Sequence, residues 1–188
     1  VLSREPSEAE ALDPGPWTLG AVLSRAPSEA EALAIRAVAA GEVALLQVLL
    51  QQHPMLSPVN VDVANHLLLA TVGANQAQCA ALMLRRGASP NAASPCGSIT
   101  ALQNAVQHKD AAIAQRLLTS CADVMALDRN QQTALHHAAR VGANGCLQAL
   151  LAGDGDGDGD GAAACGSLDV WGRTPLHWAV LNGHTSQP

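Results

Sequence analysis

The chain has 188 residues, a formal net charge of −6 and a hydrophobic fraction of 48%, with three Trp, no Tyr and no Phe. Most of the core volume must therefore come from Leu, Val and Ala, which suits helix-on-helix packing and disfavours a sandwich or barrel rich in β-branched and aromatic residues. Because no basic stripe with interleaved aromatic residues occurs, the composition argues against nucleic-acid binding.

The cysteines and the apolar runs indicate the compartment. Five cysteines are widely spaced and form no C-x-x-C pair, so they predict free thiols rather than a zinc site. Free thiols are typical of a reducing compartment, and we expect an intracellular protein, in the cytoplasm or alternatively the nucleus. The most apolar stretch, Ala32–Leu50, is broken by Arg36, Glu42 and Gln47, so no membrane span is predicted.

The start of the chain contains a duplication of its own. Residues 1–12 recur as residues 22–33 with a single difference. Both copies hold a Ser-x-x-Glu capping box, which favours the start of a helix. The second box begins at Ser28 and its helix can run on to Ala40, whereas the first helix meets Asp-Pro-Gly-Pro and must stop. We therefore predict a low-complexity arm over residues 1–27.

A longer repeat organises the remainder, residues 28–188. The segment Thr174-Pro-Leu-His-Trp-Ala-Val repeats Thr133-Ala-Leu-His-His-Ala-Ala, and Thr100-Ala-Leu-Gln-Asn-Ala-Val is a third copy. The period is 33 residues, once the eight-residue Asp-Gly run at 154–161 is removed from the last interval. Such a period indicates stacked supersecondary units that bury apolar surface only against one another. We expect an elongated stack, not a globule around a cleft.

Each unit reads as a helix, a tight turn and a second helix. Gly41, Gly142 and Gly183 lie at equivalent positions and are expected to form left-handed turns. Lys109 occupies this position in the third unit, where positive φ costs a non-glycine residue about 1 kcal/mol. We predict nine short helices in five units, the last one partial. The units cover residues 32–64, 65–99, 100–132, 133–173 and 174–188.

The last unit ends after its first helix. Two explanations remain open: the sequence is part of a longer protein, or a lone amphipathic helix closes the stack. In this helix Thr174 should act as the N-cap and Pro175 should occupy the first turn. Leu176 and Ala179 are expected to point inward, and Trp178 to be half-buried.

These motifs carry a family resemblance. The segment Asp169–His184 is similar to the ankyrin signature D-x-x-G-x-T-P-L-H-x-A-A-x-x-G-H nearly throughout, and Cys121–Asp128 and Gly87–Asn91 are similar to its connecting loop. The chain thus resembles the ankyrin-repeat family over most of its length after the arm. The resemblance implies an all-α solenoid of stacked helix-turn-helix units joined by extended loops. It also implies that His136 and His177 hydrogen-bond to backbone between neighbouring repeats, whereas His137 is expected to be exposed.

The function that the resemblance implies is protein binding through a concave face of loop tips and first helices. The mildly basic middle of the chain slightly favours an acidic protein or peptide as partner, and Trp171 is a candidate anchor. We expect no cofactor, no metal site and no obligate homo-oligomer. The expected contact positions are Gln107, His108, Arg129, Asn130, Gln132, Arg140, Val170, Trp171 and Arg173.

Two other functions remain as alternatives. No nucleophile, phosphate-loop or metalloprotease motif occurs, so we predict no enzymatic activity for this chain. The stack could instead be a regulatory segment of a larger enzyme or channel whose active part lies outside these residues. The third hypothesis is a weak calcium-responsive module, because Asp154-x-Asp-x-Asp-Gly copies half of a calcium loop. The twelfth position holds Cys165, or Ser167 in the shifted frame, instead of Glu, so we expect a solvated linker without calcium binding tighter than about millimolar.

Overall fold

The structure is a computed structural model that describes residues 29–52, 61–94, 99–152 and 160–184. Over these ranges it contains helices and one isolated bridge between Ala93 and Thr100, and no β-sheet. The helices are α2 (Glu29–Ala40), α3 (Val43–Gln52), α4 (Val61–Gly73), α5 (Ala77–Arg85), α6 (Ala101–Gln107), α7 (Ala111–Thr119), α8 (Ala134–Val141), α9 (Asn144–Ala152), α10 (Asp160–Cys165) and α11 (Pro175–Leu181).

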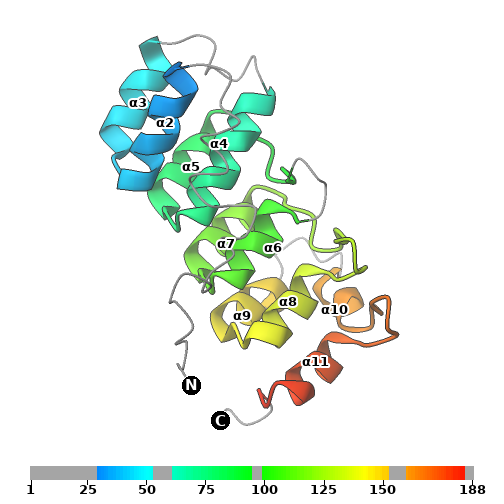
Figure 1. Cartoon of the computed structure of the whole chain (residues 1–188). Coiled ribbons are helices and arrows are strands. Elements are labelled where there is room, and N and C mark those ends of the chain that lie inside the picture. Colours follow the sequence, from blue (N-terminus) through cyan, green and yellow to red (C-terminus); the bar gives the residue numbers. More distant parts are fainter. Residues whose placement is uncertain (1–28, 53–60, 95–98, 153–159, 185–188) are drawn as a thin grey trace, which may run out of the picture.

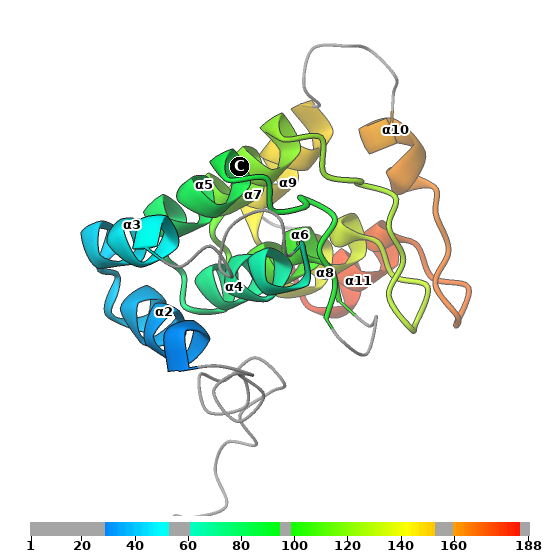
Figure 2. The ribbon, with the colours of Figure 1, turned by 90° about the horizontal axis from the view of Figure 1, so that it is seen from above.

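The helices form two rows along an elongated stack. Helices α2, α4, α6, α8 and α11 make one row, and α3, α5, α7 and α9 make the other (Figure 1, Figure 2). Helices α2 to α8 each pack against their partner in the same unit and against the equivalent helix of the next unit, as α8 does against α9 and α11. The all-α solenoid predicted from the sequence is confirmed. The described ranges hold one helix more than predicted, because α10 forms at the end of the Asp-Gly insertion.

The first helices of the units, here called the inner helices, start in the last three units at the threonines that the motif indicated. Thr100, Thr133 and Thr174 are the N-caps of α6, α8 and α11, each in a reciprocal capping box with the residue three positions later. In α6, Gln103 N–H donates to Thr100 Oγ1 over 3.2 Å. Pro175 occupies the first turn of α11, where no amide donor is required, as predicted.

The turns within the units have left-handed backbone. Gly41, Gly142 and Gly183 all have φ of +71°, and Lys109 takes the same conformation at +59°. In the second unit the left-handed residue is Asn75 rather than a glycine, because α4 continues through Gly73. This turn comes one residue later than in the other units.

A side chain from the next unit covers two of these turns. A Cβ on Gly41 would lie 2.9 Å from Gln76 Oε1, and a Cβ on Gly142 would lie 2.7 Å from His184 Nδ1. Gln76 and His184 follow the left-handed residues of their own units. The glycines therefore serve two purposes: they permit positive φ, and they make room for the neighbouring unit.

The core runs along the whole stack between the two rows. Its largest fully buried side chains include Leu67, Leu102, Ile113 and Leu150. Leu135 is 2% exposed, whereas Leu176 at the equivalent position is 69% exposed. The expectation that Leu176 points inward is therefore wrong. The difference comes from the place of the two helices in the stack. Helix α11 covers the face of α8 that holds Leu135, but no described residue covers the same face of α11.

Two predictions concern the insertion and membranes. The calcium hypothesis falls mainly on residues 153–159, which lie outside the described ranges, so the solvated linker stays a prediction. Among the helices that the structure describes, none is long and apolar enough to span a bilayer.

Candidate functional site

Two loops project side by side from one edge of the stack and lead into α8 and α11 (Figure 2). We call residues 127–133 and 168–174 the tip loops. Each closes through its own backbone, by a 3.0 Å hydrogen bond from Asp128 N–H to Gln132 O and by another from Asp169 N–H to Arg173 O. The two loops are joined where Val170 N–H donates to Asn130 O over 3.0 Å. This backbone hydrogen bond holds the two tip loops next to each other.

A buried carboxylate organises the first tip loop. Asp128 Oδ1 accepts from the N–H groups of Asn130 and Gln132, each over 2.8 Å, and Oδ2 accepts from His137 Nε2 over 3.0 Å. Burial alone would raise the pKa of Asp128, but the hydrogen bonds from His137 and the two backbone amides outweigh it and hold the pKa below its ordinary value. The charged carboxylate therefore fixes the loop.

The second tip loop uses the same arrangement with a different partner. Asp169 Oδ1 accepts from the N–H groups of Trp171 and Arg173 over 2.9 Å each, and Oδ2 accepts from Trp178 Nε1 over 2.9 Å. Gln132 Nε2 also donates to Oδ2 over 3.3 Å. Burial would raise the pKa of Asp169, yet these hydrogen bonds lower it below the ordinary value.

His137 is the main correction to the sequence interpretation. It was expected to be exposed, but it is 3% exposed, and its Nε2 lies 3.0 Å from Asp128 Oδ2. Its Nδ1 lies 3.1 Å from both Gln107 Nε2 and Arg140 Nη2, which are donors only. Nδ1 is therefore the acceptor and Nε2 carries the hydrogen given to Asp128. The ring connects α6, α8 and the first tip loop.

His136 has the structural role that the resemblance implied. Its Nδ1 accepts from Thr133 N–H over 3.2 Å, and its Nε2 donates over 3.1 Å to Arg173 O, in the second tip loop that leads into the next unit. Burial is the main cause that lowers its pKa, and the bond to Arg173 opposes the shift only in part. Gln103 replaces this histidine in the preceding unit, where its Nε2 donates to Gln132 O over 3.0 Å.

The tip loops expose a group of large apolar side chains. Val170 and Trp171 were expected at this surface, and Trp171 is 54% exposed. Leu127 and Leu168 are equally exposed but were missed by the sequence interpretation. Each directly precedes the buried aspartate of its loop, so a Leu-Asp pair at the same position of both units was the available signal.

Arg173 is held over two indole rings. Its guanidinium carbon lies 5.5 Å from the ring centre of Trp171 and 5.0 Å from that of Trp178, within the range of a cation–π interaction. The two rings meet edge to face with centres 6.2 Å apart. This stacking gives Arg173 a defined position beside α11.

The other expected contact residues fall into different environments. Arg129 and Asn130 are exposed on the first tip loop, and His108 is exposed just after α6. Gln107 and Arg140 converge on His137. Gln132 is 4% exposed and donates to Asp169, so its side chain supports the loops and is not presented to solvent.

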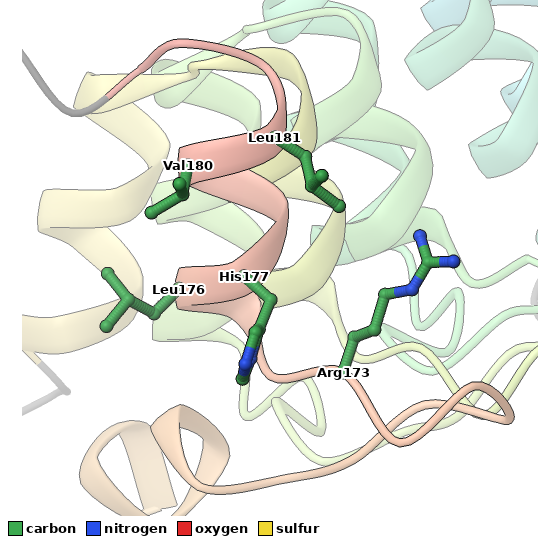
Figure 3. A pocket seen from close by; sticks show the side chains of 5 residues that line it. All are labelled: Arg173, Leu176, His177, Val180 and Leu181. Atoms are coloured by element: carbon green, nitrogen blue, oxygen red, sulfur yellow. The ribbon is translucent and has the colours of Figure 1, made fainter.

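A hollow lies at the end of the stack, on the outer face of α11. It has a volume of about 520 Å³ and is lined by Arg173, Leu176, His177, Val180 and Leu181 (Figure 3). We call these five residues the end groove. The sequence interpretation missed it because it placed Leu176 in the core. Within the described part of the chain, no three His, Cys, Asp or Glu side chains gather as a metal site.

The comparisons with known proteins agree with this architecture. A family model for ankyrin repeats in three copies matches residues 67–160 and also residues 102–186. Together the two matches cover more than half of the chain. No curated protein matches it.

Proposed function

Since the chain belongs to the ankyrin-repeat family, we propose that it binds another protein through the tip loops and the adjoining surfaces of the inner helices. Ankyrin repeats are generally protein-interaction modules and typically not enzymes.

The observation that carries the proposal is exposed apolar surface on a stiff backbone. Leu127, Leu168 and Trp171 are all more than half exposed, while Asp128 and Asp169 hold the loops beneath them. Exposed clusters of large apolar side chains mark interaction sites in soluble proteins. Because the loops are already ordered, a partner would bind without the entropic cost of fixing them. Trp171 is the natural anchor, since tryptophan is enriched among residues that dominate binding energy.

The charges around these side chains favour an acidic partner. Arg129 is exposed on the first tip loop. Arg173 is half-buried in the second tip loop, and Arg140 is half-buried on α8. The carboxylates of Asp128 and Asp169 are turned inward and satisfied by internal donors. We therefore propose a partner with an apolar patch and neighbouring acidic side chains, approached by electrostatic attraction. The proposed contacts are Leu127, Leu168 and the expected positions other than Gln132.

The scaffold and the regulatory-segment hypotheses differ in what is bound, not in the surface used. A scaffold and a regulatory segment of a larger enzyme or channel would both use the tip loops, so the identity of the partner distinguishes them. The division into an arm over residues 1–27 and a repeat domain over residues 28–188 is part of the same proposal.

A matched set of variants tests this proposal. The full chain, Trp171→Ala and Leu151→Ser are immobilised and exposed to a cell extract, and bound proteins are quantified by mass spectrometry. Leu151 is also about half exposed but belongs to α9 in the other row. A true partner is retained by Leu151→Ser and lost with Trp171→Ala, and the purified partner should bind Trp171→Ala at least about tenfold more weakly. Partners that bind both variants equally would contradict the proposal.

A further inference from the structure

A hollow lies between α5 and α7, which are neighbours in the row made by α3, α5, α7 and α9 (Figure 1). We call this row the outer row. The hollow has a volume of about 280 Å³ and is lined by Ala81, Leu84, Arg85, Arg116, Thr119 and Ser120. We call these six residues the outer hollow. Because α5 also packs against α3, and α7 against α9, the hollow lies inside the stack and not at one of its ends.

Positive charge gathers at the outer hollow without compensation. Arg85 ends α5 and Arg116 lies in the last turn of α7, and both side chains are exposed. The four helices of the outer row contain no Asp and no Glu. Asp110, the N-cap of α7, lies at the opposite end of that helix, roughly 13 Å from Thr119 along its axis. Within the described residues, neither arginine takes part in a salt bridge.

The two guanidiniums are not needed to end their helices. An arginine in a last turn often binds the terminal carbonyl groups. Here other donors reach them. Thr119 Oγ1 and Ser120 Oγ both donate to Arg116 O over 2.9 Å. The backbone N–H groups that follow α5 and α7 donate to further carbonyls of the two last turns. The guanidiniums are therefore available to a ligand.

The hydroxyl groups add acceptors beside these donors. Because Thr119 and Ser120 give their hydrogens to Arg116 O, their oxygens keep lone pairs for a ligand. Ala81 and Leu84 add aliphatic surface on the side of α5. The ligand that matches this lining carries an anionic group, N–H donors and a short apolar stem.

A phosphate monoester matches the charge better than a carboxylate does. A phosphorylated side chain carries about −1.5 to −2 charges and three acceptor oxygens, so one group can pair with two guanidiniums at once. A carboxylate carries a single charge and would leave one arginine without compensation. The hollow has room for several waters at about 30 Å³ each, which is more than the five heavy atoms of free phosphate fill. It therefore also accommodates the residue that carries the phosphate.

We propose that the outer hollow binds a phosphorylated serine or threonine in a segment of a partner protein. The phosphate pairs with Arg85 and Arg116, and backbone N–H groups of the segment donate to the oxygens of Thr119 and Ser120. The outer hollow shares no residue with the tip loops, so it is a second binding surface. Binding at this surface depends on phosphorylation of the partner.

The test uses the full chain and three synthetic peptides. Each is a fluorescently labelled peptide of seven residues, with alanine and glycine around a central phosphoserine, serine or glutamate. Fluorescence anisotropy measures binding at low and high salt. We expect the phosphoserine peptide to bind saturably, at least about tenfold more tightly than the serine peptide and about fivefold more tightly than the glutamate peptide. High salt should reduce both differences.

Variants assign the binding to the outer hollow. Arg85→Gln and Arg116→Gln should each weaken the phosphoserine peptide at least about fivefold. Arg116→Lys should recover only part of this loss, because it keeps the charge without the paired N–H groups. Arg36→Gln removes an equal charge from an exposed position of α2 and should leave binding unchanged. Trp171→Ala should also leave it unchanged, so that this proposal and the proposed function fail independently. Circular dichroism melts check that each variant is folded.

Several results would overturn the proposal. They are the absence of saturable binding up to millimolar peptide, equal affinity for the phosphoserine peptide and either of the other two, or binding that survives both Arg85→Gln and Arg116→Gln. Competition identifies the source of the phosphate. If inorganic phosphate displaced the labelled peptide as well as the unlabelled phosphoserine peptide does, the hollow would be a site for the free ion and not for a protein segment.

Discussion

Helices α8 and α11 come from the same motif, yet they differ in what surrounds them. Both begin at a capping threonine and continue with Leu-His. In α8 the leucine is 2% exposed and the histidine bonds to Arg173, in the loop that leads into the next unit, whereas in α11 the leucine is 69% exposed. The local structure is the same in both, and only the neighbours differ. The motif therefore determines the helix and its cap, while the burial of its leucine depends on a following unit.

A second contrast lies beneath the tip loops. Asp128 and Asp169 bind their own loop backbones in the same way. The residue nine positions after the aspartate differs: it is His137 in the first case and Trp178 in the second. Both rings donate an N–H to the carboxylate. Trp178 additionally supports Arg173 through its π face. The same loop geometry thus accommodates a titratable partner and a permanently neutral one.

The largest expected difference between the two helices concerns their leucines. Leu135→Ala should lower the free energy of unfolding by about 2–5 kcal/mol, because it leaves a cavity between units. Leu176→Ala should change it by less than about 0.5 kcal/mol, as for an exposed position. Urea unfolding followed by circular dichroism measures both. Equal losses would show that the face of α11 is covered in solution.

The histidines should differ in the same direction. His136→Ala removes a buried link between Thr133 and Arg173 and should cost about 1–3 kcal/mol. His177→Ala removes only a contact to its own N-cap and should cost less than about 1 kcal/mol. Parallel urea titrations give the two values. If His177→Ala proved the more costly, His177 would have contacts beyond its own N-cap.

The glycine turns provide a finer comparison. Gly142→Ala and Gly183→Ala each place a Cβ at positive φ, at a cost of about 1–2 kcal/mol. Gly142→Ala should cost more, since its Cβ would meet the ring of His184, whereas nothing lies near Gly183. Combining Gly142→Ala with His184→Ala should remove the excess. Thermal melts of the two single variants, His184→Ala and the double variant form a mutant cycle that reports the contact.

The smallest expected effect is a pH dependence. Burial lowers the pKa of His136 from its ordinary 6.5, so the unfolded chain takes up this proton first. The stabilisation is complete above pH 6.5 and is lost as the pH falls from there through the lower folded pKa. His136→Gln should remove this part of the slope and retain most of the stability, since Gln103 already makes the equivalent bonds.

Asp128 and Asp169 provide the control for this measurement. Their pKa values are lowered from 3.8, so the stability they contribute is present above that pH and is lost only below it. Unfolding curves between pH 7 and 5 therefore exclude a contribution from Asp128 and Asp169, and the comparison with His136→Gln assigns the part that belongs to His136. An unchanged slope in His136→Gln would assign the dependence to another group.

Features that depend on a few neighbouring residues were predictable from the sequence. The N-cap at Thr174, the helix start at Pro175 and the positive φ of Lys109 follow from capping and from backbone sterics, which act within one turn of chain. The order of the helices followed from the period, because equivalent units must stack to bury their leucines. The expectation that His136 bonds to backbone between neighbouring repeats came from the family resemblance.

Other features depend on residues distant in sequence, and only the tertiary structure decided them. His137 is buried where the side chains of Asp128, Gln107 and Arg140 converge on it. Arg173 has a defined position because two indoles from different elements meet there. Leu176 is exposed although its motif is the one that buries Leu135. Periodicity shows which side of a helix is apolar, but burial is a contact between two surfaces, and a pattern on one of them does not specify the other.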